Sequence, residues 1–191
     1  GAAICPFYDA LLDAENDIKQ VLVRQEANGG HAANGYARIS GKPAVCIATS
    51  GPGATNLITA IATAYADSIP IVCITGQVNT DQIGSDVFQE ADITGSAEPF
   101  VKHSYLLKDP EDTARVFKEA FYIAGTGRPG PVLIDIPMDV QKAVIDFEYP
   151  EKCEIRSYKP TTKGNYVQVR RVMAALEEAE KPLICIGGGG F

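Results

Sequence analysis

The feature of this sequence that most constrains its fold is a recurrence of short, apolar, β-branched runs with helical patterns between them. Because these runs do not alternate polar with apolar residues, both faces of each expected strand should be buried. Strands that alternate with helices form βαβ units and a parallel sheet. The pattern therefore predicts a doubly wound, mainly parallel α/β domain with helices on both faces of the sheet. The expected strands are Gln20–Arg24, Ala44–Thr49, Ile71–Thr75, Val101–Leu107 and Val132–Ile136, and the expected helices are Ala27–Ile39, Ala54–Tyr65 and Glu111–Ala124.

The pattern changes after Pro137. Residues 139–165 carry prolines and charges without a clear period, which is typical of an interdomain linker. An amphipathic helix is expected at Tyr166–Glu178, and the apolar run at 182–186 is expected to form a strand that leads into a run of glycines. We therefore expect a first domain over residues 1–141, a linker over 142–164 and the beginning of a second domain over 165–191.

Composition and charge exclude several classes of protein. The formal net charge is −7, from 17 Lys and Arg against 24 Asp and Glu, and no basic run is present, which argues against a nucleic-acid partner. No apolar stretch approaches the ~18–20 residues of a membrane span. The five cysteines lie mostly in apolar runs and form no CxxC pair, so reduced thiols and a cytoplasmic location are expected.

Candidate functional residues follow three of the expected strands, where ligands bind in open parallel sheets. Glu26 follows the first strand, the turn Thr49–Gly53 with Asn56 follows the second, and a polar loop from Gly76 to Glu90, which holds Phe88 and Gln89, follows the third. Each also has a purely structural explanation. A carboxylate is favourable at a helix N-terminus, a glycine-rich turn can simply be tight, and a polar loop can be a solvated surface loop.

Longer segments carry a resemblance to a known family. They are EANGGHAANGYAR from Glu26, KPAVCIATSGPGATNLITAIATAYADSIPIVCITGQV from Lys42, FQEADITG from Phe88 and GRPGPVLIDIP from Gly127. In this order and register, the chain from Gly1 to about Gln141 resembles the N-terminal domain of acetohydroxyacid (acetolactate) synthase large subunits.

The resemblance implies an enzyme that depends on thiamine diphosphate and condenses two pyruvates, or pyruvate and 2-oxobutanoate, with loss of CO₂. This reaction belongs to branched-chain amino-acid biosynthesis. By the same resemblance, residues 1–141 are a thiamine-diphosphate pyrimidine-binding domain truncated at its N-terminus, and residues 165–191 begin a central FAD-binding domain. The family builds its active site between subunits, so a homodimer or tetramer is expected, possibly with a regulatory small subunit. The chain alone is expected to be inactive.

The resemblance also assigns roles to individual residues. Glu26 falls on the position of the glutamate that hydrogen-bonds the aminopyrimidine N1′ atom and activates the cofactor. The ligands for Mg²⁺ and for the diphosphate are expected outside this chain, so no metal ligand is assigned here, and the FAD is expected to be structural. The remaining assignments are Thr49, Pro52, Asn56 and Gln89 in the cofactor pocket, Phe88, Gln89 and Met138 in the substrate channel, and Arg128, Gly188 and Gly189 at the flavin.

Some positions depart from the family pattern, and two alternatives remain. Gln25, Ala27 and Asn28 surround Glu26 where the family has other residues, and Met138 stands where a lysine is expected. One alternative is another thiamine-diphosphate decarboxylase or oxidase of 2-oxo acids. The other is a non-catalytic α/β module that binds a regulatory subunit or a nucleotide.

Overall fold

The computed structural model describes residues 1–14 and 17–190. The chain divides into two compact units, Gly1–Ile155 and Arg156–Phe191. The first unit holds the strands β1 (Ala44–Ala48), β2 (Ile71–Gln77), β3 (His103–Leu106) and β4 (Val132–Pro137). Its α-helices are α1 (Cys5–Asp13), α2 (Glu26–Ser40), α3 (Pro52–Thr55), α4 (Ile58–Ala66), α5 (Ile93–Ala97), α6 (Thr113–Gly125) and α7 (Met138–Lys142), and the second unit holds α8 (Tyr166–Glu178). Short 3₁₀ helices are η1 (Ala2–Ile4), η2 (Glu98–Phe100), η3 (Pro110–Asp112) and η4 (Gly188–Gly190).

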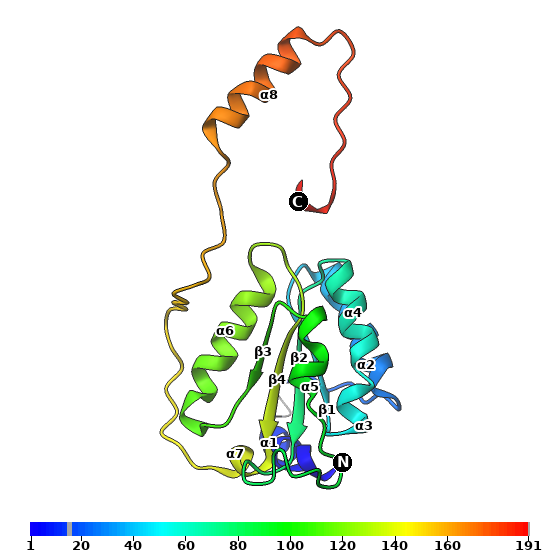
Figure 1. Ribbon diagram of the computed structural model, residues 1–191, viewed down its shortest axis with the longest axis vertical. Coiled ribbons are helices and arrows are strands. Elements are labelled where there is room, and N and C mark those ends of the chain that lie inside the picture. Colours follow the sequence, from blue (N-terminus) through cyan, green and yellow to red (C-terminus); the bar gives the residue numbers. More distant parts are fainter. Residues whose placement is uncertain (15–16, 191) are drawn as a thin grey trace. The chain divides into compact units, whose positions relative to one another are not determined.

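The four strands form one sheet in the order β1-β2-β4-β3, and every neighbouring pair is parallel. The two central strands, β2 and β4, are buried along their whole length. Parallel neighbours need a crossover, and helices supply it, as Figure 1 shows. The doubly wound, parallel α/β fold expected from the sequence is therefore confirmed.

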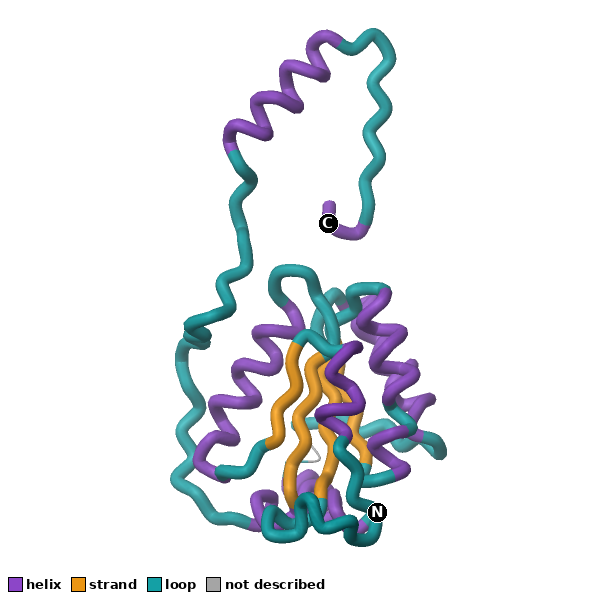
Figure 2. Tube along the Cα trace, in the orientation of Figure 1, coloured by secondary structure: helices purple, strands orange, loops and turns teal. Residues whose placement is uncertain are grey.

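Helices cover both faces of the sheet. On one face, the buried side chains of α2, α4 and α5 form a single apolar cluster with alternate residues of β1 and β2, among them Ala44, Cys46 and Cys73. On the other face, α6 packs against β2, β3 and β4 through a buried stripe that includes Val116, Ala120 and Ile123. Figure 2 shows the strands enclosed between these helices. The core is thus built from small and β-branched residues.

The strand predicted from the sequence at Gln20–Arg24 does not form, so this prediction is wrong. Residues 20–25 form no helix or strand, and the side chains of Val21 and Leu22 are exposed. The composition of residues 20–24 favours an extended backbone, and Gln25, the N-cap residue before α2, is extended. A strand also needs a hydrogen-bonded neighbour, and β1 pairs only with β2 among the described residues. Propensity alone does not supply that neighbour.

Two further expectations need correction. The helix expected at Ala54–Tyr65 is interrupted at Asn56 and Leu57, which separate α3 from α4. The run at 182–186 forms no strand, and its side chains are exposed in the structure. As with Gln20–Arg24, an apolar β-branched run remains outside a sheet where no neighbouring strand pairs with it.

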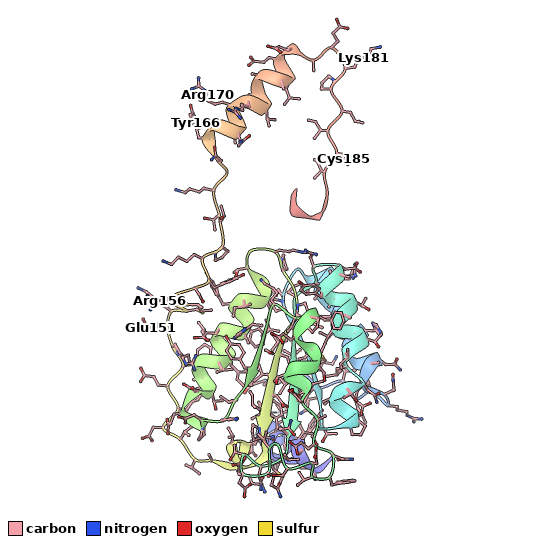
Figure 3. The ribbon with its side chains drawn as sticks, in the orientation of Figure 1. Glu151, Arg156, Tyr166, Arg170, Lys181 and Cys185 are labelled. Atoms are coloured by element: carbon pink, nitrogen blue, oxygen red, sulfur yellow. The ribbon has the colours of Figure 1, made fainter. Side chains whose placement is uncertain are left out.

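The expected linker region forms no helix or strand between Lys142 and Tyr166, a stretch that is fully described (Figure 2). Part of it packs on the first unit, because Phe147 and Tyr149 line a shallow hollow with Phe117 of α6. In the second unit, the Asn165 side chain caps α8 by accepting the backbone N–H groups of Val167 and Gln168. Figure 3 labels Tyr166 and Arg170 on this helix, and the Arg170 guanidinium lies 5.5 Å from the centre of the Tyr166 ring.

The end of the sheet contains a buried acid that the sequence did not indicate. Asp135 of β4 accepts hydrogen bonds from Thr75 Oγ1 at 2.7 Å and from Gln77 Nε2 at 2.9 Å, both on β2. Burial raises the pKa of Asp135 to about 7. The hydrogen bonds from Thr75 and Gln77 lower it in part, and the nearby Asp92 raises it further. Asp135 therefore takes up a proton at a much higher pH in the folded chain than in the unfolded one.

We expect Asp135→Asn to flatten the dependence of stability on pH. In the wild type, the folded state holds a proton that the unfolded state has lost. The free energy of unfolding should therefore fall as pH rises from about 4 to about 7, by a few kcal/mol at most. Asparagine can accept from Gln77 and donate to Thr75 without a charge, so the variant should be as stable as the wild type or more stable at pH 8.

Urea denaturation of the 191-residue chain at pH 5 and pH 8 measures this effect. Asp146→Asn, which changes an exposed aspartate, is the matched control and should behave as the wild type. If Asp135→Asn keeps the wild-type dependence on pH, burial of this carboxyl does not cause it.

Candidate functional site

Three segments of the chain meet at the carboxyl edge of the sheet. They are the start of α2, the turn between β1 and α3, and the loop between β2 and α5. Figure 1 shows α3 and the N-terminal helices beyond the arrowheads of the strands. This is the edge at which ligands bind in open parallel sheets. The structure thus brings together all three candidates selected from the sequence, Glu26 and the two loops.

Glu26 is the first residue of α2 and is half-buried. Its Oε2 atom accepts a hydrogen bond from Asn56 Nδ2 at 3.0 Å, although 30 residues separate the two in the chain. A carboxylate at a helix N-terminus is also stabilised by the free N–H groups there. Glu26 is therefore held in one orientation by its helix and by the side chain of the C-cap residue of α3.

Thr49 and Gly53 complete the surroundings of this carboxylate. A Cβ atom on Gly53 would lie 2.6 Å from Thr49 Cγ2 and 3.5 Å from Glu26 Oε1, so the missing side chain leaves room for both. The Thr49 Oγ1 atom is buried and has no hydrogen-bond partner among the described residues. An unpaired buried hydroxyl is costly, by about 1–3 kcal/mol, unless a ligand or water completes it. A carboxylate and an unpaired hydroxyl so placed suit a ligand with both donor and acceptor atoms.

Gly51 brings Gln89 to the same edge. Its backbone has φ 59° and ψ −123°, a conformation open in practice only to glycine. A Cβ atom at Gly51 would lie 2.7 Å from the Gln89 carbonyl oxygen and 2.9 Å from Gln89 Cα. The two backbones are therefore in direct contact, and the glycine-rich turn fixes where the loop after β2 passes.

Pro52, Phe88 and Met138 also lie at this edge but contribute differently. Pro52 begins α3 and is exposed. Phe88 precedes Gln89, and 85% of its surface is exposed. Met138 begins α7 at the end of β4 and is separated from β1 by β2. Among the described residues, none of these three side chains makes a hydrogen bond like the one from Asn56 to Glu26.

The residues expected at a flavin lie elsewhere. Arg128 is in the loop that leads into β4, at the amino edge of the sheet. Its Nε atom donates to Ser68 Oγ at 2.8 Å, and its guanidinium lies 5.9 Å from the centre of the Tyr65 ring. Gly188 and Gly189 are in η4 of the second unit. The structure therefore does not bring Arg128 together with Glu26.

One residue of the selected loop was given no role of its own from the sequence. Glu90 follows Phe88 and Gln89, and its carboxylate accepts hydrogen bonds from the backbone N–H groups of Gly84 and Val87. The sequence places it directly after two selected residues. The Glu90 side chain turns back to its own loop because of the backbone angles there. The sequence does not reveal those angles.

The described residues offer neither a metal-binding cluster nor a helix that could span a membrane. Among the residues that the structure describes, no group of three or more His, Cys, Asp or Glu side chains could hold a metal ion. Within the same residues, no helix has the length and apolar character that crossing a membrane requires.

Comparisons with known proteins show which family this chain resembles. Residues 1–96 match the family model described as thiamine pyrophosphate enzyme, N-terminal TPP binding domain. The chain is 51% identical over 195 residues to an acetolactate synthase of Arthrospira platensis, an alignment that covers 100% of this chain and 34% of that protein. It is 50% identical over 192 residues to a probable acetolactate synthase large subunit of Methanocaldococcus jannaschii, covering 99% of this chain and 32% of that protein. It is also 51% identical over 191 residues to an acetolactate synthase large subunit of Buchnera aphidicola, covering 99% and 33%.

The chain thus spans about a third of the length of the curated relatives it matches. The resemblance inferred from the sequence segments is confirmed, because the similarity extends over the whole chain in one alignment. The matched residues 1–96 include Glu26, the turn after β1 and the loop that holds Gln89.

We expect Gly51→Ala to lower the free energy of unfolding by roughly 3 kcal/mol or more. An alanine would meet both an unfavourable backbone conformation and the backbone of Gln89. Gly41→Ala is a matched control, since Gly41 also has a positive φ, of 68°, but its added Cβ would meet nothing within 4 Å. It should cost only about 1 kcal/mol. Urea denaturation of the 191-residue chain compares them, and equal losses would mean that contact with Gln89 does not constrain the turn.

Proposed function

The chain belongs to the thiamine pyrophosphate enzymes that carry an N-terminal TPP binding domain, and from this premise we propose that it forms the thiamine-ring side of an acetolactate synthase. The observation that carries the proposal is the half-buried Glu26 carboxylate at the carboxyl edge of the sheet, held by a hydrogen bond from Asn56. The substrates we propose are pyruvate and a second 2-oxo acid, either pyruvate or 2-oxobutanoate. The products would enter branched-chain amino-acid biosynthesis.

The residues present fit an aminopyrimidine ring. Such a ring has a nitrogen that a carboxyl group can hydrogen-bond and an amino group that needs an acceptor. Glu26 supplies the carboxyl oxygens, and Thr49 Oγ1 is a buried hydroxyl able to donate or to accept. Gly53 keeps the space beside the Glu26 carboxyl and the Thr49 methyl group free of a side chain. We propose that Thr49, Pro52, Asn56 and Gln89 surround the ring together with Glu26.

When bound, thiamine diphosphate supplies the nucleophilic carbon and the electron sink that decarboxylation of a 2-oxo acid requires. The part of this chain is to hold and move a proton at Glu26. Asn56 donates to Oε2, which leaves Oε1 available to a ring nitrogen. A carboxyl held in this way can pass a proton to the ring and take it back without a change of rotamer. Phe88, Gln89 and Met138 are proposed to face the substrate.

Other cofactors and partners are also proposed. We propose that the ligands for Mg²⁺ and for the diphosphate come from another domain or subunit. We propose a structural FAD that contacts Arg128, Gly188 and Gly189. Two of the relatives reported above are named large subunits, which supports a small-subunit partner. Self-association as a dimer or tetramer and a cytoplasmic location complete the proposal.

In the full-length enzyme, we expect Glu26→Gln to lower acetolactate formation from pyruvate by about 10²–10⁴-fold, because glutamine can hydrogen-bond the ring but cannot exchange a proton with it. Binding of thiamine diphosphate, measured by calorimetry, should weaken far less than turnover. Glu98→Gln, at an exposed glutamate in η2, is the matched control and should leave both unchanged.

The products and the control decide between the alternatives. Acetaldehyde or acetyl phosphate in place of acetolactate from the wild-type enzyme would indicate another thiamine-diphosphate decarboxylase or oxidase. Unchanged turnover in Glu26→Gln would favour a non-catalytic binding module.

A further inference from the structure

The loop between β2 and α5, residues 78–92, has no helix or strand and yet is held by defined contacts. Its first part is fixed by Asp139 of α7, whose carboxylate accepts from the Thr80 backbone N–H at 3.1 Å and from Thr80 Oγ1 at 2.5 Å. Its last part is fixed by Gln77, whose Nε2 atom donates to the Ala91 carbonyl at 2.9 Å. Both ends of the loop are thus attached to the ends of β4 and β2.

The middle of the loop is organised by Glu90. One oxygen of its carboxylate accepts the backbone N–H of Gly84, and the other accepts the N–H of Val87 at 3.2 Å. These bonds close residues 84–90 into a turn around the carboxylate. Hydrogen bonds from backbone N–H groups, that of Gly84 above all, hold the pKa of Glu90 below its usual value. The group is therefore an ionised acceptor at neutral pH, and such bonds are stronger than those between neutral groups.

The turn also forces two residues into an unfavourable backbone conformation. Asp86 has φ 54° and Gln89 has φ 59°, in the left-handed region that residues other than glycine rarely adopt. Conformations of this kind persist only where the surroundings compensate for them. The contacts available for this are the bonds to Glu90 and the contact between the Gln89 backbone and Gly51.

The residues so positioned are those expected to meet the ligand. Gln89 touches the glycine-rich turn that follows β1, and Phe88 precedes it with 85% of its surface exposed. Because the Phe88 ring is hardly packed against other side chains, its position is set by the backbone of the turn. That backbone in turn depends on the Glu90 carboxylate.

We propose that Glu90 is a positioning residue, whose carboxylate fixes the Gly84–Gln89 turn and thereby places Phe88 and Gln89 at the substrate side of the site. This proposal rests on the proposed function, because it requires that the candidate site bind the thiamine ring and a 2-oxo acid. Glu90 itself touches neither. It acts through the backbone that carries the two residues before it.

The test uses Glu90→Ala and Glu90→Gln in the full-length enzyme. Hydrogen exchange measured by mass spectrometry should show the amides of residues 84–87 exchanging about tenfold faster in Glu90→Ala, with the strands and the melting temperature unchanged. Only the middle of the loop should respond, because Asp139 and Gln77 still hold its ends. Glu90→Gln keeps one acceptor oxygen and should restore part of the protection.

Kinetics supply the second readout. In Glu90→Ala, KM for pyruvate should rise by about tenfold while kcat falls much less, because the substrate-facing residues are misplaced but Glu26 is not. Glu90→Gln should again lie between the wild type and Glu90→Ala. Asp81→Asn removes another carboxylate of the same loop, one that makes no hydrogen bond to the described residues, and should change neither exchange nor KM.

Three results would overturn the proposal. Unchanged exchange at residues 84–87 would show that the turn does not need Glu90. Faster exchange with unchanged KM would show that the turn does not position residues for the substrate. Faster exchange throughout the domain with a lower melting temperature would show a general role in folding. A wild-type enzyme that forms no acetolactate would instead refute the proposed function, and the exchange of residues 84–87 would still report on the turn.

Discussion

The structure depends on a buried hydrogen-bonded cluster where the two central strands end. Asp135 on β4 accepts from Thr75 and Gln77 on β2, and Gln77 also donates to Ala91 at the end of the long loop. A buried acid is tolerated only where its oxygens are paired, and it then fixes the groups that pair with it. This cluster therefore sets the register of β2 against β4 and also the point at which the loop returns to the domain. The turn that carries Gln89 starts from that fixed geometry.

The candidate site is a product of several such constraints rather than of one motif. Glu26 comes from a helix start, Thr49 from the turn after β1, Asn56 from the end of α3 and Gln89 from the loop after β2. Each segment is aligned by a contact with another, through the Asn56 side chain or through the backbone contact of Gly51 with Gln89. The buried hydroxyl of Thr49 has no hydrogen-bond partner among the described residues, so no contact there offsets the free energy lost when it is removed from water. Such a cost is expected where a ligand completes the hydrogen bonding.

The sequence predicted what local patterns determine. The central strands, α2 and α6 form within a few residues of the expected limits. The strand expected at Gln20–Arg24 does not form, because pairing depends on a neighbour that propensity does not specify. Glu26 and Asn56 were selected separately as residues that follow expected strands, and their contact across 30 residues depends on the packing of α2 against β1 and α4. Asp135 was missed because a single charge within an apolar strand does not indicate its partners, and Glu90 was missed because its contacts depend on two positive φ angles.

Glu26 and Arg128, for which different roles are proposed, lie at opposite edges of the sheet. Arg128 is held at the amino edge by Ser68 and Tyr65, whereas Glu26 lies at the carboxyl edge. A strand of five to seven residues separates these edges, a distance of roughly 15–20 Å. A flavin in contact with Arg128 would therefore approach the domain far from Glu26 and from the residues that Glu90 positions. In the proposed arrangement, contact at that edge would stabilise the arrangement of domains, whereas the proton transfer proposed at Glu26 would occur at the opposite edge.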